Sequence, residues 1–182
     1  MNNRIENWHT EIDKTTKNFI SNFGGLDLKQ LNWKPNTKSW SIAQVVDHLL
    51  KTNESYFIIP DKMKSEDFKP SLLSKTNFFP KFFGKLILKG VDPNTKRKVK
   101  TGGVFEPAQS NLQPDIIEKF NSSQKQLHEF LDNNAEDIKN RKVIPSPLNK
   151  HIVYHFDTVI DIIVNHQKRH FNQAMRVLKN QS

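Results

Sequence analysis

Residues 156–179 read FDTVIDIIVNHQKRHFNQAMRVLK, and their pattern decides the fold. On a helical wheel, which advances about 100° per residue, apolar side chains gather on one face and polar side chains on the other. The apolar face holds Phe156, Val159, Ile163, Ala174 and Val177, and the polar face holds Asp157, Asp161, Asn165, Lys168, Arg169, Asn172 and Arg176. His166 and His170 fall on the apolar face. The segment is therefore predicted to be a long amphipathic helix that carries two histidines toward the core.

Three earlier stretches, at about residues 5–23, 39–59 and 114–131, show the same helical periodicity. In the second, Ser41 and Gln44 form the capping-box pattern that opens a helix. Each stretch is followed by residues that end helices, namely Gly24-Gly25, Pro60 and Asp132-Asn133-Asn134. No segment alternates like a strand between hairpin turns, so we expect no sheet. The sequence predicts an all-α fold, a four-helix bundle, in one domain of residues 1–182.

The connection between the second and third helices, residues 61–108, is expected to be long and mostly irregular. It is rich in Lys, Pro and Gly, and its one short apolar run, from Phe78 to Leu88, can form a small extra helix. Connections of this length inside one domain are usually functional. We therefore expect this segment to lie near a binding site or to cover one.

Positive charge is concentrated in the same region. The chain has a net charge of +9, and residues 61–100 hold eleven Lys and Arg against four Asp and Glu, or +7 of that total. Lys96, Arg97, Lys98 and Lys100 form a short basic cluster. A solvated loop is the favoured interpretation, and an anionic small-molecule site or a nucleic-acid site are the alternatives. Nucleic acid is the least supported partner, because no binding motif or aromatic platform accompanies the charge.

Composition excludes several classes of protein. The chain has no cysteine, which rules out disulfides, thiolate metal ligands and a cysteine nucleophile, so any thiol chemistry must use a thiol from a small molecule. No run approaches the ~18 consecutive apolar residues that a membrane span needs, and the first residues lack the apolar centre of a signal peptide. We therefore expect a cytoplasmic protein without a membrane partner.

Three histidines are the candidate functional residues. His166 and His170 lie one helical turn apart, so two imidazoles facing a bundle core can bind one metal ion. His48, at the edge of the apolar stripe of the second helix, is the candidate third ligand, because bundle sites are built from facing helices. His151 and His155 have the same spacing, but they fall in an expected loop or helix start and form the main competing pair. The alternative is that each histidine is an ordinary core residue that bonds a carbonyl or carboxylate.

Two segments carry a family resemblance. They are Leu31-Asn32-Trp33-Lys34-Pro35 followed by Ser39-Trp40-Ser41-Ile42-Ala43-Gln44-Val45-Val46-Asp47-His48-Leu49, and Pro147-Leu148 leading to His166-Gln167-Lys168-Arg169-His170-Phe171-Asn172-Gln173. The first resembles the second-helix signature of the DinB-like superfamily, and the second resembles its closing H-x-x-R-H-x-x-Q helix. A weaker similarity to YfiT-like members lies at Lys100-Thr101 and Phe105-Glu106-Pro107. This chain has Ser146-Pro147 and Leu148-Asn149 where many members have His-Pro and Leu-Gly.

The resemblance implies a four-helix bundle, often a homodimer, with a divalent metal ion held by His48, His166 and His170. Such an ion (Zn, Ni or Fe) keeps its full charge and an open position at a neutral three-histidine site, which is the pattern of catalytic sites. The family similarity implies either a metal-dependent hydrolase or a transferase that uses a low-molecular-weight thiol such as bacillithiol or mycothiol, acting on a small-molecule substrate. The alternative is a non-catalytic, stress-related metal-binding protein.

No general acid or base can be assigned from the sequence. Asp47, Glu54 and Gln173 are candidate partners that would orient the histidine rings. The basic residues of 61–100 suit an anionic thiol cofactor, because Lys and Arg near a pocket attract carboxylates and phosphates.

Overall fold

Four long helices make up most of the fold. The computed structural model describes residues 2–95, 102–108 and 112–181. Within these residues the longest helices are α1 (Asn2–Phe23), α3 (Ile42–Phe57), α6 (Ile116–Asn133) and α8 (Phe156–Lys179). The shorter elements are α2 (Leu28–Asn32), α4 (Ile59–Lys64), η1 (Leu72–Lys75), α5 (Phe78–Val91), η2 (Gly103–Phe105), α7 (Ala135–Lys139), β1 (Val143–Pro145) and β2 (Val153–His155). The all-α prediction is confirmed.

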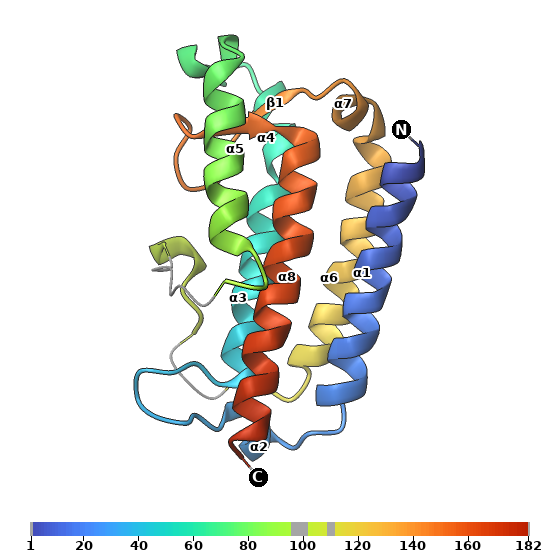
Figure 1. Cartoon of the computed structure of the whole chain (residues 1–182), viewed down its shortest axis with the longest axis vertical. Coiled ribbons are helices and arrows are strands. Elements are labelled where there is room, and N and C mark those ends of the chain that lie inside the picture. The colour runs from blue at the N-terminus through green and yellow to red at the C-terminus, as the bar shows by residue number, and fades with distance from the viewer. Residues whose placement is uncertain (1, 96–101, 109–111, 182) are drawn as a thin grey trace.

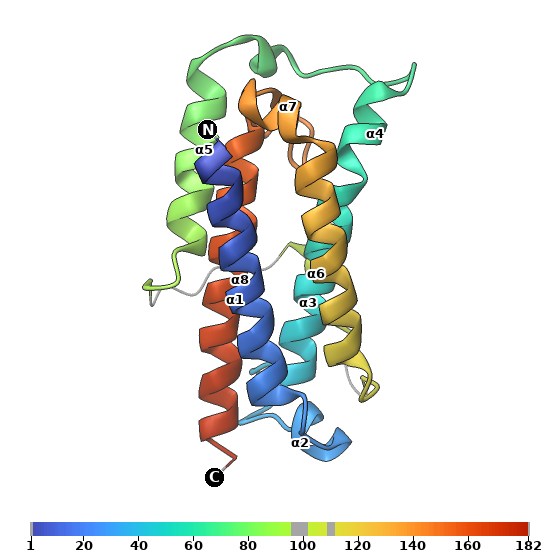
Figure 2. The same cartoon turned by 90° about the vertical axis from the view of Figure 1, so that its right-hand side faces the viewer.

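The directions of the long helices explain the long connection. Figures 1 and 2 show α1, α3, α6 and α8 side by side along the long axis, with α1 and α8 running one way and α3 and α6 the other. Because α3 and α6 run in the same direction, the chain between them must return along the bundle. Helix α5 makes part of that return while it packs against α8 and β2.

The prediction of a mostly irregular segment at residues 61–108 is wrong. The described part of this segment contains α4, η1, α5 and η2. Pro60 does not end helical structure there, because proline fits the first turn of α4. Helix α5 spans the expected apolar run, and Gly84 lets it approach α8, since a Cβ at this position would lie 2.9 Å from Cγ2 of Thr158. The basic residues Lys96, Arg97, Lys98 and Lys100, together with Thr101, lie outside the described residues.

The expectation of no sheet is also wrong. Strands β1 and β2 pair antiparallel, with Val143 opposite His155 and Pro145 opposite Val153. Each strand is three residues long, so neither shows the sustained alternation by which a strand is recognised in a sequence. The pair closes the end of the bundle where α8 begins.

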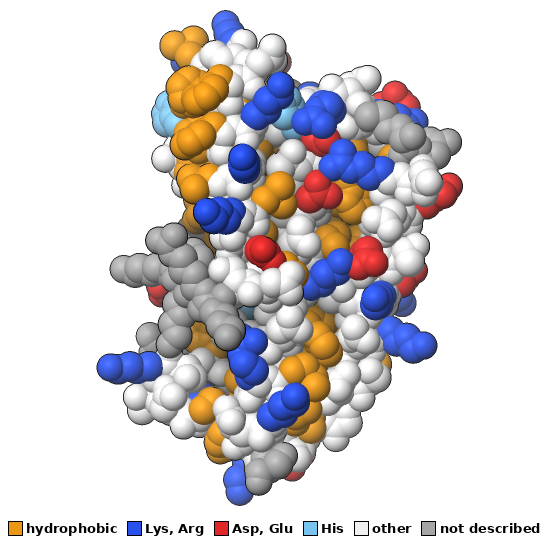
Figure 3. Space-filling view, in the orientation of Figure 1, with side chains coloured by type: hydrophobic (Ala, Val, Ile, Leu, Met, Phe, Trp, Pro, Cys, Tyr) orange, Lys and Arg blue, Asp and Glu red, His pale blue; other side chains and the backbone are white. Residues whose placement is uncertain are grey.

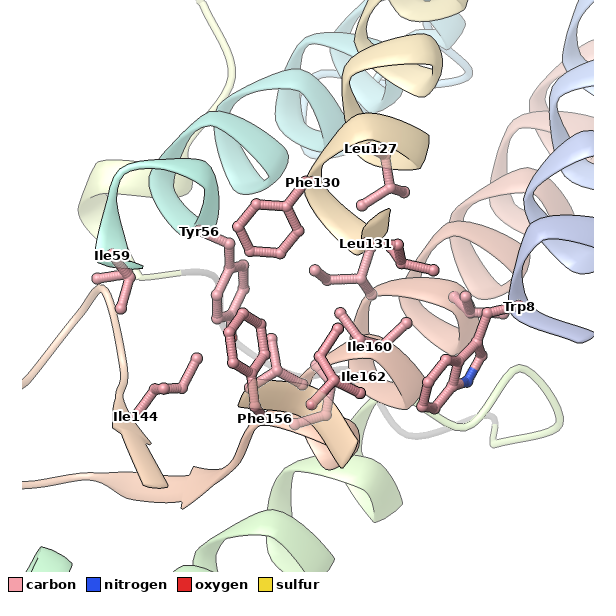
Figure 4. Packing of buried hydrophobic residues seen from close by; sticks show 14 of the residues in the cluster. Trp8, Tyr56, Ile59, Leu127, Phe130, Leu131, Ile144, Phe156, Ile160 and Ile162 are labelled. Carbon is pink, nitrogen blue, oxygen red and sulfur yellow. The ribbon is translucent and has the colours of Figure 1, made fainter. Parts of the chain in front are cut away.

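Buried apolar side chains form two clusters. Figure 4 shows the first cluster, in which Trp8, Tyr56, Phe130, Phe156 and Ile160 pack between the long helices. The second lies nearer the other end of the bundle and includes Phe19, Phe23, Val45, Leu49, Phe120 and Ala174. Buried polar residues separate the two clusters along the long helices, namely Thr15, Thr52, Asn53, Ser123, Gln124 and Gln167. The bundle core thus contains a polar layer near its middle.

The outer face of α5 exposes apolar side chains. Figure 3 shows hydrophobic side chains gathered over α5, and the exposed ones there are Phe78, Phe82 and Leu86. Lys81, Lys85 and Lys89 are exposed on the same helix. No helix in the described residues is long and apolar enough to cross a membrane.

Candidate metal centre

His48 comes from the second turn of α3, whose start is fixed by its cap. The side chain of Ser41 accepts a hydrogen bond from the backbone N–H of Gln44 at 3.1 Å, and the Gln44 side chain accepts from the N–H of Ser41 at 3.1 Å. This reciprocal capping box satisfies two backbone donors at the helix start. Because the cap fixes the phase of the helix, His48 turns inward and is 3% exposed.

His166 and His170 come from α8, which packs against α3. Nε2 of His166 lies 3.1 Å from Nε2 of His48 and 3.0 Å from Nε2 of His170. Within the described residues these three side chains form the one group of three or more histidines and acids whose ligand atoms all lie within 4.8 Å of one another. The structure therefore brings together the three histidines chosen from the sequence.

The hydrogen bond of His48 fixes its tautomer. Nδ1 of His48 lies 2.6 Å from the carbonyl oxygen of Phe105. A carbonyl oxygen only accepts, so Nδ1 must carry the hydrogen, and a neutral imidazole has only one. Nε2 of His48 therefore presents a lone pair toward His166.

Burial keeps all three rings neutral. It lowers the pKa of His48, although the hydrogen bond to Phe105 opposes this effect. It lowers the pKa of His166 well below the usual value, with His170 and His48 adding to the effect. It also lowers the pKa of His170 to about 3, with His48 again contributing. Metal ions bind neutral imidazole, so the rings are in the state that a metal site requires.

One face of α3 holds the segment that carries the Phe105 carbonyl. The Gln44 amide donates to the carbonyl oxygen of Ala108 at 2.8 Å, and the Asp47 carboxylate accepts from the Ala108 N–H at 2.7 Å. Nζ of Lys51 donates to the carbonyl oxygen of Glu106 at 2.9 Å and lies 3.0 Å from Asp47. Asp47, a candidate ring partner in the sequence, therefore acts on His48 through this segment rather than by contact.

Trp40 covers the histidines, a role that the sequence did not suggest. Its ring centroid lies 5.0 Å from that of His48 and 6.1 Å from that of His170. The planes of Trp40 and His170 are 18° from parallel. The indole thus limits the access of water to the imidazoles. Phe105 was visible in the sequence only as part of a weak family motif, and its backbone oxygen carries no side-chain signal.

The competing histidines lie elsewhere. Nδ1 of His155 lies 2.8 Å from the carbonyl oxygen of Arg141, and Nδ1 of His151 lies 3.3 Å from the Ser71 hydroxyl. Neither belongs to the three-histidine group. His155 ends β2 and occupies the N-cap position of α8, the helix start expected for it, although its side chain makes no cap hydrogen bond.

The other two candidate ring partners have different positions. Glu54 lines a separate cavity of about 480 Å³ with Leu50 of α3 and residues near the start of α6. Gln173 neighbours His170 and acts to raise the pKa of that ring. Of the two, only Gln173 therefore lies near a ring, and the buried Nδ1 of His170 has no hydrogen-bond partner in the described residues.

Arg169 ties the end of the α5 segment to α8 beside the histidines. Its Nη1 donates to the carbonyl oxygens of Asp92 and Thr95, each at 3.2 Å. This contact brings residues 92–95 to the same part of α8 as His166 and His170. Lys96, Arg97, Lys98 and Lys100 follow in the sequence and lie outside the described residues.

The donor set fits a divalent metal ion. Zinc–nitrogen distances of about 2.0–2.1 Å place two ligands of a tetrahedral site about 3.3 Å apart. The Nε2 separations of 3.1 and 3.0 Å need only a small adjustment to match that value. Three neutral imidazole nitrogens, of which that of His48 has its lone pair directed inward, can therefore hold one ion.

Comparisons with known proteins agree with this arrangement. A model of the DinB superfamily matches residues 11–174. YuaE, an uncharacterized protein of Bacillus subtilis (strain 168), is 28% identical over 161 residues, which cover 84% of this chain and 86% of YuaE. No solved structure matches. The matched family segment includes all three histidines.

Proposed function

The chain belongs to the DinB superfamily, and on that premise we propose that it is a divalent-metal-dependent enzyme whose ligands are His48, His166 and His170. The reaction would be the transfer of a low-molecular-weight thiol or a hydrolysis, with a small molecule as substrate. The observation that carries the proposal is the convergence of three neutral Nε2 atoms at separations of 3.1 and 3.0 Å. An ordinary core histidine instead directs its second nitrogen to a carbonyl, carboxylate or water.

A site with three histidine ligands supports catalysis better than a purely structural role. Structural zinc sites use four protein ligands, whereas catalytic sites use three and leave a position for water or substrate. Because neutral imidazoles carry no negative charge, a divalent ion bound by them keeps its full charge of +2. When bound, the ion would lower the pKa of a coordinated water to about 7, or hold a thiol as its thiolate.

The surrounding residues would orient the ligands and restrict water. The Phe105 carbonyl holds His48 in the tautomer that faces the centre, and Trp40 stacks on His170 and contacts His48 at a tilt. Excluding water strengthens the electrostatic interactions in a site of this kind. These contacts would keep the imidazoles aligned whether or not substrate is present.

The choice between the two reactions depends on a thiol. The chain contains no cysteine, so the thiol of a transferase must come from a small molecule. Arg169 brings residues 92–95 close to the ligands, and a cluster of four Lys and Arg follows in the sequence. Positive charge near a pocket favours an anionic thiol carrier.

Metal analysis of purified variants tests the proposal. We expect about one tightly bound divalent ion per chain in the native protein as purified, loss of that ion in His166→Ala, and retention in His151→Ala, which removes a histidine outside the group. After cobalt substitution, adding a small thiol should change the visible spectrum, because a thiolate would enter the coordination sphere. A bound metal that no thiol, water analogue or substrate perturbs would favour the stress-related metal-binding role. Native protein that binds no divalent metal would contradict the proposal.

A further inference from the structure

A second histidine cluster lies on the other side of the bundle, between α1 and α6. His9 and Asp13 are one turn apart on α1, and His128 and Asp132 are one turn apart on α6. The two helices run in opposite directions (Figure 2). Each histidine therefore faces the aspartate of the other helix, and the two His-x3-Asp motifs form a nearly symmetric group.

The four side chains form a continuous row. Nε2 of His9 lies 3.0 Å from Oδ1 of Asp132, and Nε2 of His128 lies 3.0 Å from Oδ1 of Asp13. The two Nδ1 atoms lie 2.5 Å apart. The ring planes are 5° from parallel with centroids 4.8 Å apart, so the rings meet end to end rather than face to face.

The ring nitrogens of His9 and His128 have too few hydrogens to make every contact in this row a hydrogen bond. A neutral imidazole has one N–H, and an ionised carboxylate can only accept. Each Nε2 must therefore donate to its aspartate, which leaves both Nδ1 atoms with lone pairs directed at each other across 2.5 Å. Two facing lone pairs repel, so a metal ion or a proton between His9 and His128 would stabilise the arrangement.

We propose that the Nδ1 atoms of His9 and His128 bind a second divalent transition-metal ion that joins α1 to α6. Imidazole nitrogen suits Zn, Ni and Cu ions. A carboxylate that accepts the other ring N–H is the usual partner of a metal-bound histidine, because it fixes the tautomer and makes the ligand more basic. Asp132 and Asp13 occupy that position for His9 and His128.

The site has room to accept an ion. Two nitrogen ligands of one tetrahedral ion lie about 3.3 Å apart, so the rings must separate and also tilt until their lone pairs converge on the ion. The side chains of His9 and His128 are 24% and 27% exposed, and their aspartates are 66% and 74% exposed, so all four can move. In the described residues no third acid or histidine groups with these Nδ1 atoms, and water would complete the coordination. We expect weaker and more exchangeable binding than at the three-histidine centre.

Nickel titrations of four proteins separate the two sites. We expect two equivalents to bind to the native chain, one to His166→Ala, one to His9→Ala, and none to the His9→Ala/His166→Ala double variant. Nickel should raise the melting temperature of His166→Ala, because an ion that binds only the folded state stabilises it. His151→Ala serves as the control and should bind two equivalents. Nickel binding to His166→Ala therefore measures the site of His9 and His128 without the three-histidine centre.

The aspartates provide an independent check. Asp13→Asn and Asp132→Asn keep both Nδ1 ligands, and we expect each to weaken nickel binding in the His166→Ala background by roughly 10–100-fold, the usual effect of losing such a partner. Nitrogen NMR should show nickel perturbing Nδ1, not Nε2, of His9 and His128. The proposal is wrong if His166→Ala binds no nickel. It is also wrong if His9→Ala and His128→Gln, each added to His166→Ala, leave nickel binding unchanged. A pair of Nδ1 signals that responds only to pH would also overturn it, because a shared proton rather than a metal ion would then lie between the rings.

Discussion

Nδ1 of His48 donates to the carbonyl oxygen of Phe105 across 2.6 Å, although the two residues are 57 positions apart in the chain. The contact makes the candidate metal centre depend on a loop segment as well as on two helices. The loop is held by side chains of α3 that do not touch the imidazoles. Substitutions of Gln44, Asp47 or Lys51 on that face of α3 should therefore alter metal binding without changing a ligand.

Asp47→Ala tests this dependence. The carboxylate accepts the N–H of Ala108 and pairs with Lys51, so its removal should release the segment that carries the Phe105 carbonyl. We expect metal affinity to fall by roughly 10–100-fold, as when an orienting partner of a ligand is lost. The melting temperature of the metal-free protein should fall less than that of the metal-bound protein, because the pair is only partly buried, with Lys51 35% and Asp47 14% exposed. Glu54→Gln, on the same helix but away from the histidines, is the matched control, and an equal loss of affinity in both variants would argue against the loop effect.

Trp40 should report on metal binding by its fluorescence. Its ring lies 5.0 Å from the His48 ring, which is close enough for a bound paramagnetic ion such as Cu²⁺ or Co²⁺ to quench the indole. We expect Trp40→Phe to remove most of the quenching while still binding the ion. Trp33→Phe should retain it. In the His9→Ala background, which removes the second proposed site beside Trp8, quenching that survives in Trp40→Phe would place the ion away from the three histidines.

The sequence predicted which histidines lie together better than it predicted their surroundings. His166 and His170 stand on the apolar stripe of a long helix and His48 stands at the edge of another, and the family resemblance joined the three into one set. The tautomer of His48 depends on the backbone oxygen of Phe105, which no side-chain pattern reveals. The stacking of Trp40 depends on how α3 and α8 pack, which is a tertiary property.

The errors in the fold prediction have similar causes. The all-α class and the long helices followed from periodicity, but β1 and β2 are too short to show any. Asp157 was placed on the polar face of α8 by the helical wheel, yet it is 2% exposed. The wheel reports one helix alone, whereas the environment of Asp157 is made by Arg4 of α1 and Arg141 before β1.

Asp157→Asn should destabilise the junction of these elements. The carboxylate accepts from Arg4 at 2.8 Å and from Arg141 at 2.6 Å, and Arg141 has a left-handed backbone with φ of 52°. Hydrogen bonds to charged groups contribute about 1.5–3 kcal/mol when buried. Because both arginines are partly exposed and can rehydrate, we expect a loss of about 1–3 kcal/mol in the free energy of unfolding by urea. Asp161→Asn, which removes the more exposed partner of Arg4, should cost less; an equal or larger loss there would contradict the role given to Asp157.

Alkaline pH should destabilise the protein through a buried tyrosine pair. The hydroxyls of Tyr56 and Tyr154 lie 2.9 Å apart in the core. Burial raises the pKa of Tyr56 well above its usual value and raises the pKa of Tyr154 to about 12. Unfolded tyrosines lose their protons from about pH 10, while the folded pair keeps them, so the folded state holds more protons in this range. Stability from this pair should be complete below about pH 10 and should be lost as the pH rises toward 12, by up to about 1.4 kcal/mol per pH unit for each tyrosine.

Urea unfolding at about pH 8, 10 and 11 measures this effect, and a variant without either hydroxyl isolates it. Tyr56→Phe/Tyr154→Phe keeps the aromatic packing of the first cluster and removes both titrating groups, so its stability should decline less steeply above pH 10 than that of the native protein. Lysine and the other alkaline groups are common to both proteins, and their contribution cancels in the difference. Parallel declines in the two proteins would show that Tyr56 and Tyr154 ionise alike in the folded and unfolded states, and that burial does not protect their protons.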